Sequence, residues 1–171
     1  MKKGVPMLNE REVVKLYVAT FNRAPDTPGL WYWVYDSGLP LEGVAESFFQ
    51  QPETQALYPP GSSTETFIKA VYRNLFNREP EQEGMEYWRE EIDSGRIPRG
   101  RFILAVINGA QGADAQILEN KTDVGSYFAL HNISDIQLAR KVLENIDENE
   151  ESVTSAMKMI DNYIISHGGT P

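Results

Sequence analysis

Hydrophobic residues recur every three or four positions along most of the 171-residue chain. This spacing places them on one face of an α-helix, and it continues with short interruptions from about residue 10 to about residue 165. No stretch alternates strictly between apolar and polar residues over five or more positions, as a half-buried β-strand would. The pattern therefore predicts an all-α fold with about nine helices.

Two parts of this pattern repeat each other. Residues 17–33 and 72–88 align at a constant offset of 55 residues, and unrelated windows of this length would share about one identity. They share these pairs: Tyr17/Tyr72, Phe21/Phe76, Asn22/Asn77, Arg23/Arg78, Pro25/Pro80, Gly29/Gly84, Tyr32/Tyr87 and Trp33/Trp88. The chain thus contains a duplicated helix-turn-helix unit. We expect one helical domain over residues 1–171, with internal repeats at 10–58 and 64–110 and a helical C-terminal part at 111–166.

Local signals mark the helix ends in the first repeat. Asn9 and Glu12 form a capping box, which predicts a helix start near residue 10. Gly29 follows two prolines and predicts the start of a second short helix. A third helix should stop before Pro52, because proline lacks the N–H that would continue it.

The C-terminal part carries helices with no counterpart in the repeats. One is expected at about residues 113–131, with Gly125 as a weak point inside it because glycine disfavours a helix interior. Ser134 and Gln137 form a capping box that predicts the next helix, whose apolar stripe continues to Ile146. A last helix should extend to about residue 164.

Trp33 and Trp88 occupy the same place in the two repeats. We interpret each as a core residue whose indole N–H donates a hydrogen bond to a backbone carbonyl. The functional alternative is an aromatic platform for a sugar ring. That role would require an exposed tryptophan face.

The charged residues of the repeated motif also have a structural and a functional interpretation. Arg23 and Arg78 follow a helix C-terminus, where a guanidinium can bind carbonyls or a carboxylate; anion binding is the alternative. Asp26 and Glu81 precede the second helix, where a carboxylate can cap free N–H groups; calcium binding is the alternative. We interpret the other motif residues as mainly structural as well: Tyr17, Asn22, Pro25, Gly29, Tyr72, Asn77, Pro80 and Gly84.

Composition excludes several functional classes. The chain has 16 basic and 25 acidic residues, a net charge of −9, and no cluster of Lys or Arg, so nucleic acid is not an expected partner. The absence of cysteine excludes disulfides, thiolate zinc sites and a cysteine nucleophile. No apolar run approaches the roughly 18 residues of a membrane span, so membrane insertion is not expected. The first ten residues lack the apolar region of a signal peptide.

Candidate catalytic groups are few. Ser126, His131 and Asp135 are close in sequence, but Ser126 is not surrounded by a nucleophile elbow and His131 falls at a predicted helix end. No motif for a phosphate, a cofactor or a catalytic metal is present. The sequence therefore predicts a protein that is not an enzyme and needs no cofactor, with calcium as the open alternative.

The repeated motif resembles a known family. Its first copy contains Leu16-Tyr17, Phe21-Asn-Arg-Ala-Pro-Asp26, Gly29-Leu30 and Tyr32-Trp33, and Asn120-Lys-Thr-Asp-Val-Gly125 with Tyr127-Phe128 continues the resemblance. Over about residues 10–165 the chain is similar to a bacterial domain of unknown function that recurs in S-layer, RTX-type and other secreted calcium-associated proteins. A weaker resemblance, through Tyr72-Arg-Asn-Leu-Phe-Asn77, is to the phycobilisome rod linker domain.

The resemblance implies a module of a cell-surface or secreted protein, although this chain shows no signal peptide. Its expected partner is a surface polysaccharide or another protein. The leading hypothesis is therefore a non-catalytic binding or assembly module. One alternative is a glycan-acting enzyme with two carboxylates drawn from Asp26, Asp36, Glu83 and Glu90, about 5 to 10 Å apart. A calcium-dependent module is the other.

Overall fold

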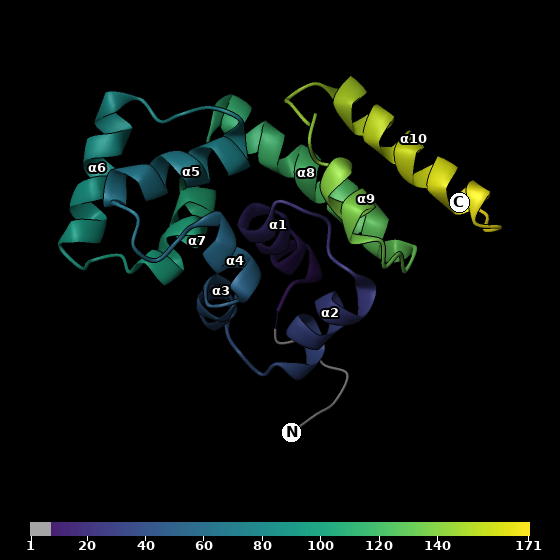
Figure 1. The fold of residues 1–171 in the computed structure, drawn as a ribbon, viewed down its shortest axis with the longest axis horizontal. Helices are drawn as coiled ribbons and strands as arrows, with labels where there is room; N and C mark the ends of the chain where they lie inside the picture. Colours follow the sequence, from purple (N-terminus) through teal and green to yellow (C-terminus); the bar gives the residue numbers. More distant parts are fainter. Residues whose placement is uncertain (1–7) are drawn as a thin grey trace.

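The computed structural model describes residues 8–171 and confirms the all-α prediction. Within this range it contains ten α-helices, one π-helical turn and no β-strand. The elements are α1 (Glu10–Phe21), α2 (Thr27–Trp31), η1 (Tyr32–Asp36), α3 (Leu41–Phe49), α4 (Pro52–Leu57), α5 (Thr64–Phe76), α6 (Gln82–Asp93), α7 (Arg99–Gly109), α8 (Gly112–Leu130), α9 (Ile136–Lys141) and α10 (Glu150–Ser166) (Figure 1). The prediction about a signal peptide falls mainly on residues 1–7, outside the described range.

The start of the chain follows the capping signals, with one correction. The Asn9 side chain accepts a hydrogen bond from the Glu12 N–H at 3.1 Å, so α1 begins where the capping box predicts. The prediction that Gly29 opens the second helix is wrong by two residues. The Asp26 carboxylate accepts the Gly29 N–H at 2.9 Å and caps a helix that begins at Thr27.

The second helix of the first repeat differs in form from its counterpart α6. After α2 the chain continues into the π-helical turn η1, in which the Ser37 N–H donates to the Tyr32 carbonyl at 2.8 Å, five residues earlier. The counterpart α6 is a regular α-helix throughout. Such π-helical turns are rare and occur frequently at functional sites.

An additional short helix follows the third helix of the first repeat. As expected, α3 ends before Pro52, but Pro52 then begins α4. Proline suits a first helical position, because its fixed φ is helical and its missing N–H is not needed there. The buried Thr54 hydroxyl donates to the Phe48 carbonyl at 2.5 Å and fastens α4 to the end of α3.

The core is built around α1 and α8, which lie against each other near the centre of the molecule (Figure 1). Gly125 in α8 faces α1, and a Cβ atom at this position would lie 2.7 Å from Val18 Cγ1 and 3.2 Å from Val14 Cγ1. The interpretation of Gly125 as a weak point is therefore incomplete. Its lack of a side chain lets the two helices approach closely.

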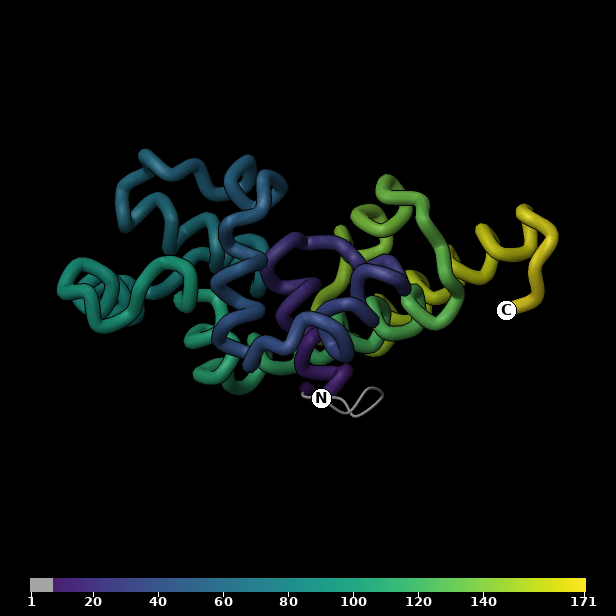
Figure 2. The backbone as a smooth tube through the Cα atoms, turned by 90° about the horizontal axis from the view of Figure 1, so that it is seen from below, coloured from purple at the N-terminus to yellow at the C-terminus, as the bar shows by residue number. Residues whose placement is uncertain are grey.

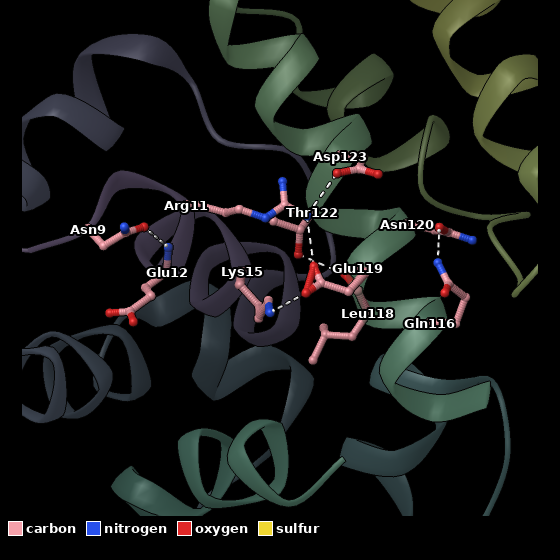
Figure 3. A network of polar contacts seen from close by, with 10 residues as sticks. All are labelled: Asn9, Arg11, Glu12, Lys15, Gln116, Leu118, Glu119, Asn120, Thr122 and Asp123. Atoms are coloured by element: carbon pink, nitrogen blue, oxygen red, sulfur yellow. Dashed lines mark hydrogen bonds and ion pairs between the residues drawn. The ribbon is translucent and has the colours of Figure 1, made fainter. Parts of the chain in front are cut away.

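Ion pairs connect α1 and α8 at the solvent-exposed edge of their contact. Arg11 donates to Glu119 at 2.7 Å and to Asp123 at 2.8 Å, and Lys15 donates to Glu119 at 2.9 Å. Figure 3 shows these side chains between α1 and α8. Because four charges form one network, it fixes the helix pair better than a single surface pair would.

The other face of α8 meets α5 and the segment before α10 through buried polar groups. The Lys121 side chain is fully buried, and its Nζ donates to the Asn74 carbonyl at 2.6 Å. Burial lowers the pKa of Lys121 to about 8. The adjacent Asn120 donates to the Asp147 carbonyl at 2.7 Å. These bonds join the second repeat and the segment before α10 to α8.

The C-terminal part departs from the predicted capping box. Ser134 is exposed, and the cap of α9 is Asp135, whose carboxylate accepts the Leu138 N–H at 3.0 Å. The apolar stripe predicted a helix up to Ile146, but α9 ends at Lys141. Beyond it the backbone forms tight turns, in which each hydrogen bond joins residues three positions apart.

The two views place α6 and α10 at opposite ends of the molecule (Figures 1 and 2). No helix within residues 8–171 combines the length and the hydropathy that a membrane crossing requires.

Candidate ligand-binding groove

The asparagines of the repeated motif have a backbone role that the sequence interpretation missed. Asn22 and Asn77 each follow the first helix of their repeat, with φ of 52° and 61°. Asparagine adopts this left-handed conformation more readily than most residues and can end a helix there. An Asn directly after an apolar helical stripe is the signal that could have predicted this cap.

The two arginines occupy equivalent positions with different burial. The buried Arg23 binds Glu53 through Nε at 2.7 Å, and Arg78, in a more exposed position, binds Asp114 through a terminal nitrogen at 2.7 Å. In each repeat the remaining terminal nitrogen donates to the carbonyl of the next residue. Each guanidinium thus already faces a carboxylate.

The repeated tryptophans are half-buried and lie against the third helix of their repeat. Trp33 packs edge-on against Phe48, with ring centroids 5.0 Å apart, and Trp88 packs against Phe102 at 5.3 Å. The expected carbonyl partner is wrong for Trp88, whose indole N–H donates to the Tyr72 hydroxyl at 2.9 Å.

The acceptors before the second helix differ between the repeats. Asp26 caps α2 and also accepts the Tyr17 hydroxyl at 3.2 Å, while burial raises the pKa of Tyr17 to about 12. Glu81 occupies the cap position of α6, but its side chain makes no capping hydrogen bond. Among the other motif positions, Pro25 is buried and Pro80 and Gly84 are half-buried.

Trp31 is the most exposed tryptophan within residues 8–171. It is not one of the identities that the two repeats share. It is 56% exposed and lines a groove of about 720 Å³ together with Tyr35. Leu130, at the C-terminal end of α8 and 76% exposed, also lines this groove. The residues of the described range that line it are Glu10, Thr27, Pro28, Leu30, Trp31, Tyr35, Ala129, Leu130 and Asn132. Its volume falls within the roughly 300 to 1,000 Å³ of ligand pockets.

The end of α8 is held against α2, so the groove is part of the folded core. The Thr27 hydroxyl donates to the Ala129 carbonyl, and Leu30 is buried beneath the groove. Four polar groups along the groove make no hydrogen bond or ion pair with another residue in the range 8–171: the Glu10 carboxylate, the Trp31 indole N–H, the Tyr35 hydroxyl and the Asn132 amide. The groove therefore combines apolar walls with donors and acceptors that no other residue between 8 and 171 engages.

The second repeat has a cleft at the equivalent place with different chemistry. It has a volume of about 500 Å³, and four of its lining residues correspond to groove residues at the offset of 55: Glu65 to Glu10, Gln82 to Thr27, Met85 to Leu30, and Glu86 to Trp31. Here Lys69 and Glu65 form an ion pair at 3.1 Å, and Arg89 also lines the cleft. The aromatic surface belongs to the first repeat.

The four acidic residues considered for catalysis lie in three places: at the N-terminal cap of α2, on η1 and on α6. Asp26 is engaged as a helix cap, Asp36 is exposed on η1, and Glu83 and Glu90 are exposed on α6. Residues 8–171 contain no group of three or more His, Asp or Glu placed to hold a metal ion. His131 lies at the end of α8 with its ring edge-on to Tyr127.

The fold and the groove define a helical protein of two related units, with an aromatic ligand-sized groove on the first. Residues 45–112 match the model of DUF4214, a domain of unknown function, which agrees with the resemblance to a bacterial domain of this kind. This match starts within α3, includes all of the second repeat and ends at the first residue of α8. Trp31, Tyr35 and Leu130 lie outside it. Neither a curated protein nor a solved structure matches the chain.

Proposed function

We propose that the protein is a non-catalytic binding module of a bacterial cell-surface or secreted protein, and that it holds its ligand in the groove beside Trp31. The observation that carries this proposal is the pair of exposed aromatic side chains, Trp31 and Tyr35, which line one groove together with the exposed Leu130. Exposed aromatic and apolar side chains that line a groove are typical of recognition sites.

The chemistry of the groove supports binding in preference to a reaction. Glu10 is the one carboxylate among the described lining residues, whereas glycan hydrolysis requires a pair of carboxylates. Tyr35 and Trp31 supply contact area and hydrogen-bond donors, which are the usual contributions of aromatic residues to binding.

The proposal is tested by sedimentation of the purified chain with isolated bacterial envelope fragments. We expect the wild-type chain to sediment with the fragments, and Trp31→Ala or Tyr35→Ala to reduce the bound fraction about tenfold. Tyr87→Ala is the matched control, because Tyr87 is also 56% exposed but lies on α6, away from the groove.

Thermal unfolding of each variant separates loss of binding from loss of fold. The exposed position of Trp31 predicts an unfolding temperature close to that of the wild type, since no closed cavity is left behind. Equal binding by the wild type and both groove variants, or no binding to any envelope fraction, would overturn the proposal.

A further inference from the structure

We infer that the groove is specific for an uncharged glycan whose pyranose rings stack on Trp31 and Tyr35; this inference rests on the proposed function. The C–H face of a pyranose ring is apolar and slightly positive, and the π face of an aromatic ring is negative. Trp31 and Tyr35 are four residues apart along α2 and η1, so they present their rings on the same side of the helical segment.

The free polar groups of the groove match the hydroxyl groups of a sugar. The indole N–H of Trp31 is a donor, the carboxylate of Glu10 is an acceptor, and the Tyr35 hydroxyl and Asn132 amide act as both. Each sugar hydroxyl is also both donor and acceptor, so a bound glycan can satisfy all four groups. A purely apolar ligand would bury them without partners, at a cost for each.

The charge distribution selects against an acidic glycan. Within residues 8–171 no Lys or Arg lines the groove, and Glu10 adds a negative charge to its lining. The nearest cations along α1, Arg11 and Lys15, are bound to Glu119 and Asp123. A uronate, sialate or phosphate group would therefore meet the negative charge of Glu10, and no Lys or Arg from the described part of the groove lining would compensate for it.

The equivalent cleft of the second repeat supports the assignment of the glycan site to the first repeat. Glu86, which lines this cleft, aligns with Trp31 at the offset of 55 residues, and Glu90 of α6 aligns with Tyr35. This cleft therefore lacks the stacking surface, although it has the same position relative to its two helices. We expect one glycan site per chain, on the first repeat.

Isothermal titration calorimetry on the full chain tests the inference. The probes are four neutral hexasaccharides (β-1,4-glucose, β-1,4-mannose, β-1,4-galactose and β-1,4-N-acetylglucosamine), hexagalacturonate as the anionic probe, and a proline decapeptide. We expect at least one neutral hexasaccharide to bind at a stoichiometry of one, about tenfold more tightly than hexagalacturonate. Its affinity should change little between low and high salt, because no ion pair forms.

Three variants test whether the binding measured by calorimetry takes place in the groove. Trp31→Ala should reduce the affinity for the neutral hexasaccharide about tenfold, whereas Tyr87→Ala should leave it unchanged. Glu10→Gln keeps a hydrogen-bonding group and removes the charge, so it should raise the affinity for hexagalacturonate more than that for the neutral probe.

The other outcomes separate this inference from the proposed function. Binding of the proline decapeptide or of hexagalacturonate alone, lost in Trp31→Ala, would overturn the neutral-glycan inference and leave the groove as a binding site for another ligand. Neutral-glycan binding that survives Trp31→Ala would overturn both. If none of the six probes bound, but the chain still sedimented with envelope fragments and Trp31→Ala abolished this, only the neutral-glycan inference would be overturned.

Discussion

The two repeats share their turns and differ on the outer face of their second helix. Both keep the left-handed asparagine, the arginine bound to a carboxylate and the half-buried tryptophan. On the outer face the first repeat has Pro28, Trp31 and Tyr35, and the second has Glu83, Glu86 and Glu90.

This difference separates residues that form the unit from residues that give one copy its own surface. The shared residues recur because the same turn and the same helix packing must be built twice. An exposed tryptophan costs solubility and contributes little to the core, and its presence on one copy alone is what the proposed binding role would require. The acidic outer face of the second copy is a hydrated surface.

The repeats also hold α8 differently. The first repeat meets it at Gly125, where α1 and α8 approach closely, and the second meets it through the buried Lys121. The first repeat thus adds a close helix contact and exposed ion pairs to its packing on α8, whereas the second adds a buried lysine.

The largest expected difference between the repeats concerns their arginines. Arg23→Met should lower the free energy of unfolding by about 3 kcal/mol, because the side chain is 9% exposed and its loss removes the main partner of Glu53. Arg78→Met should cost less than about 1 kcal/mol, since Arg78 is 42% exposed. Urea unfolding at pH 7 measures both values. Equal costs would show that burial does not distinguish the two turns.

The repeated framework could be predicted from the sequence because burial imposes a helical period on apolar residues. The first helix illustrates this, since Val13, Val14 and Tyr17 mark its buried face in both sequence and structure. The residue at which a helix starts was harder to predict where two neighbouring side chains could each cap it. Asp135 took the role predicted for Ser134, because its carboxylate reaches the Leu138 N–H.

The groove could not be predicted from local sequence. Trp31 and Trp33 are two residues apart in one helical segment, and their burial depends on which side the rest of the fold covers. Leu130 joins the groove because α8 ends beside α2, a contact between residues about a hundred positions apart. Aligning the repeats offered one available signal, since Trp31 stands opposite Glu86 and Tyr35 opposite Glu90.

A smaller effect is expected from pH at the contact between α8 and the second repeat. The pKa of Lys121 is about 8 in the fold, against about 10.4 in an unfolded chain. Between these values the unfolded chain binds more protons, so the free energy of unfolding should rise with pH, by about 2 kcal/mol from pH 7.5 to 9.5. Below pH 8 the folded protein bears the cost of a buried charge.

The measurement is urea unfolding across this pH range for the wild type and for Lys121→Met. We expect the variant to lose the rise, because Met fills a similar volume without a titrating group. The range stops at pH 9.5 because the raised pKa of Tyr17 and Tyr58, about 12 each, makes stability fall once tyrosines ionise in the unfolded chain. A variant with the same slope as the wild type would assign the effect to another group.

The smallest effects come from the glycines at matching positions of the second helices, and they should have opposite signs. A Cβ atom at Gly29 would lie 2.9 Å from both carboxylate oxygens of Asp26, so Gly29→Ala should displace the cap and cost about 1 kcal/mol. The nearest atom to a Cβ at Gly84 is the Tyr72 hydroxyl at 4.0 Å, and Glu81 makes no cap there to lose. Gly84→Ala should therefore stabilise α6 by about 0.5 kcal/mol, through helix propensity. Thermal unfolding of the two variants under one condition compares the signs directly. If both variants were more stable than the wild type, the Asp26 cap would have to move aside at no cost in free energy. The two turns would then be equivalent in energy as well as in sequence.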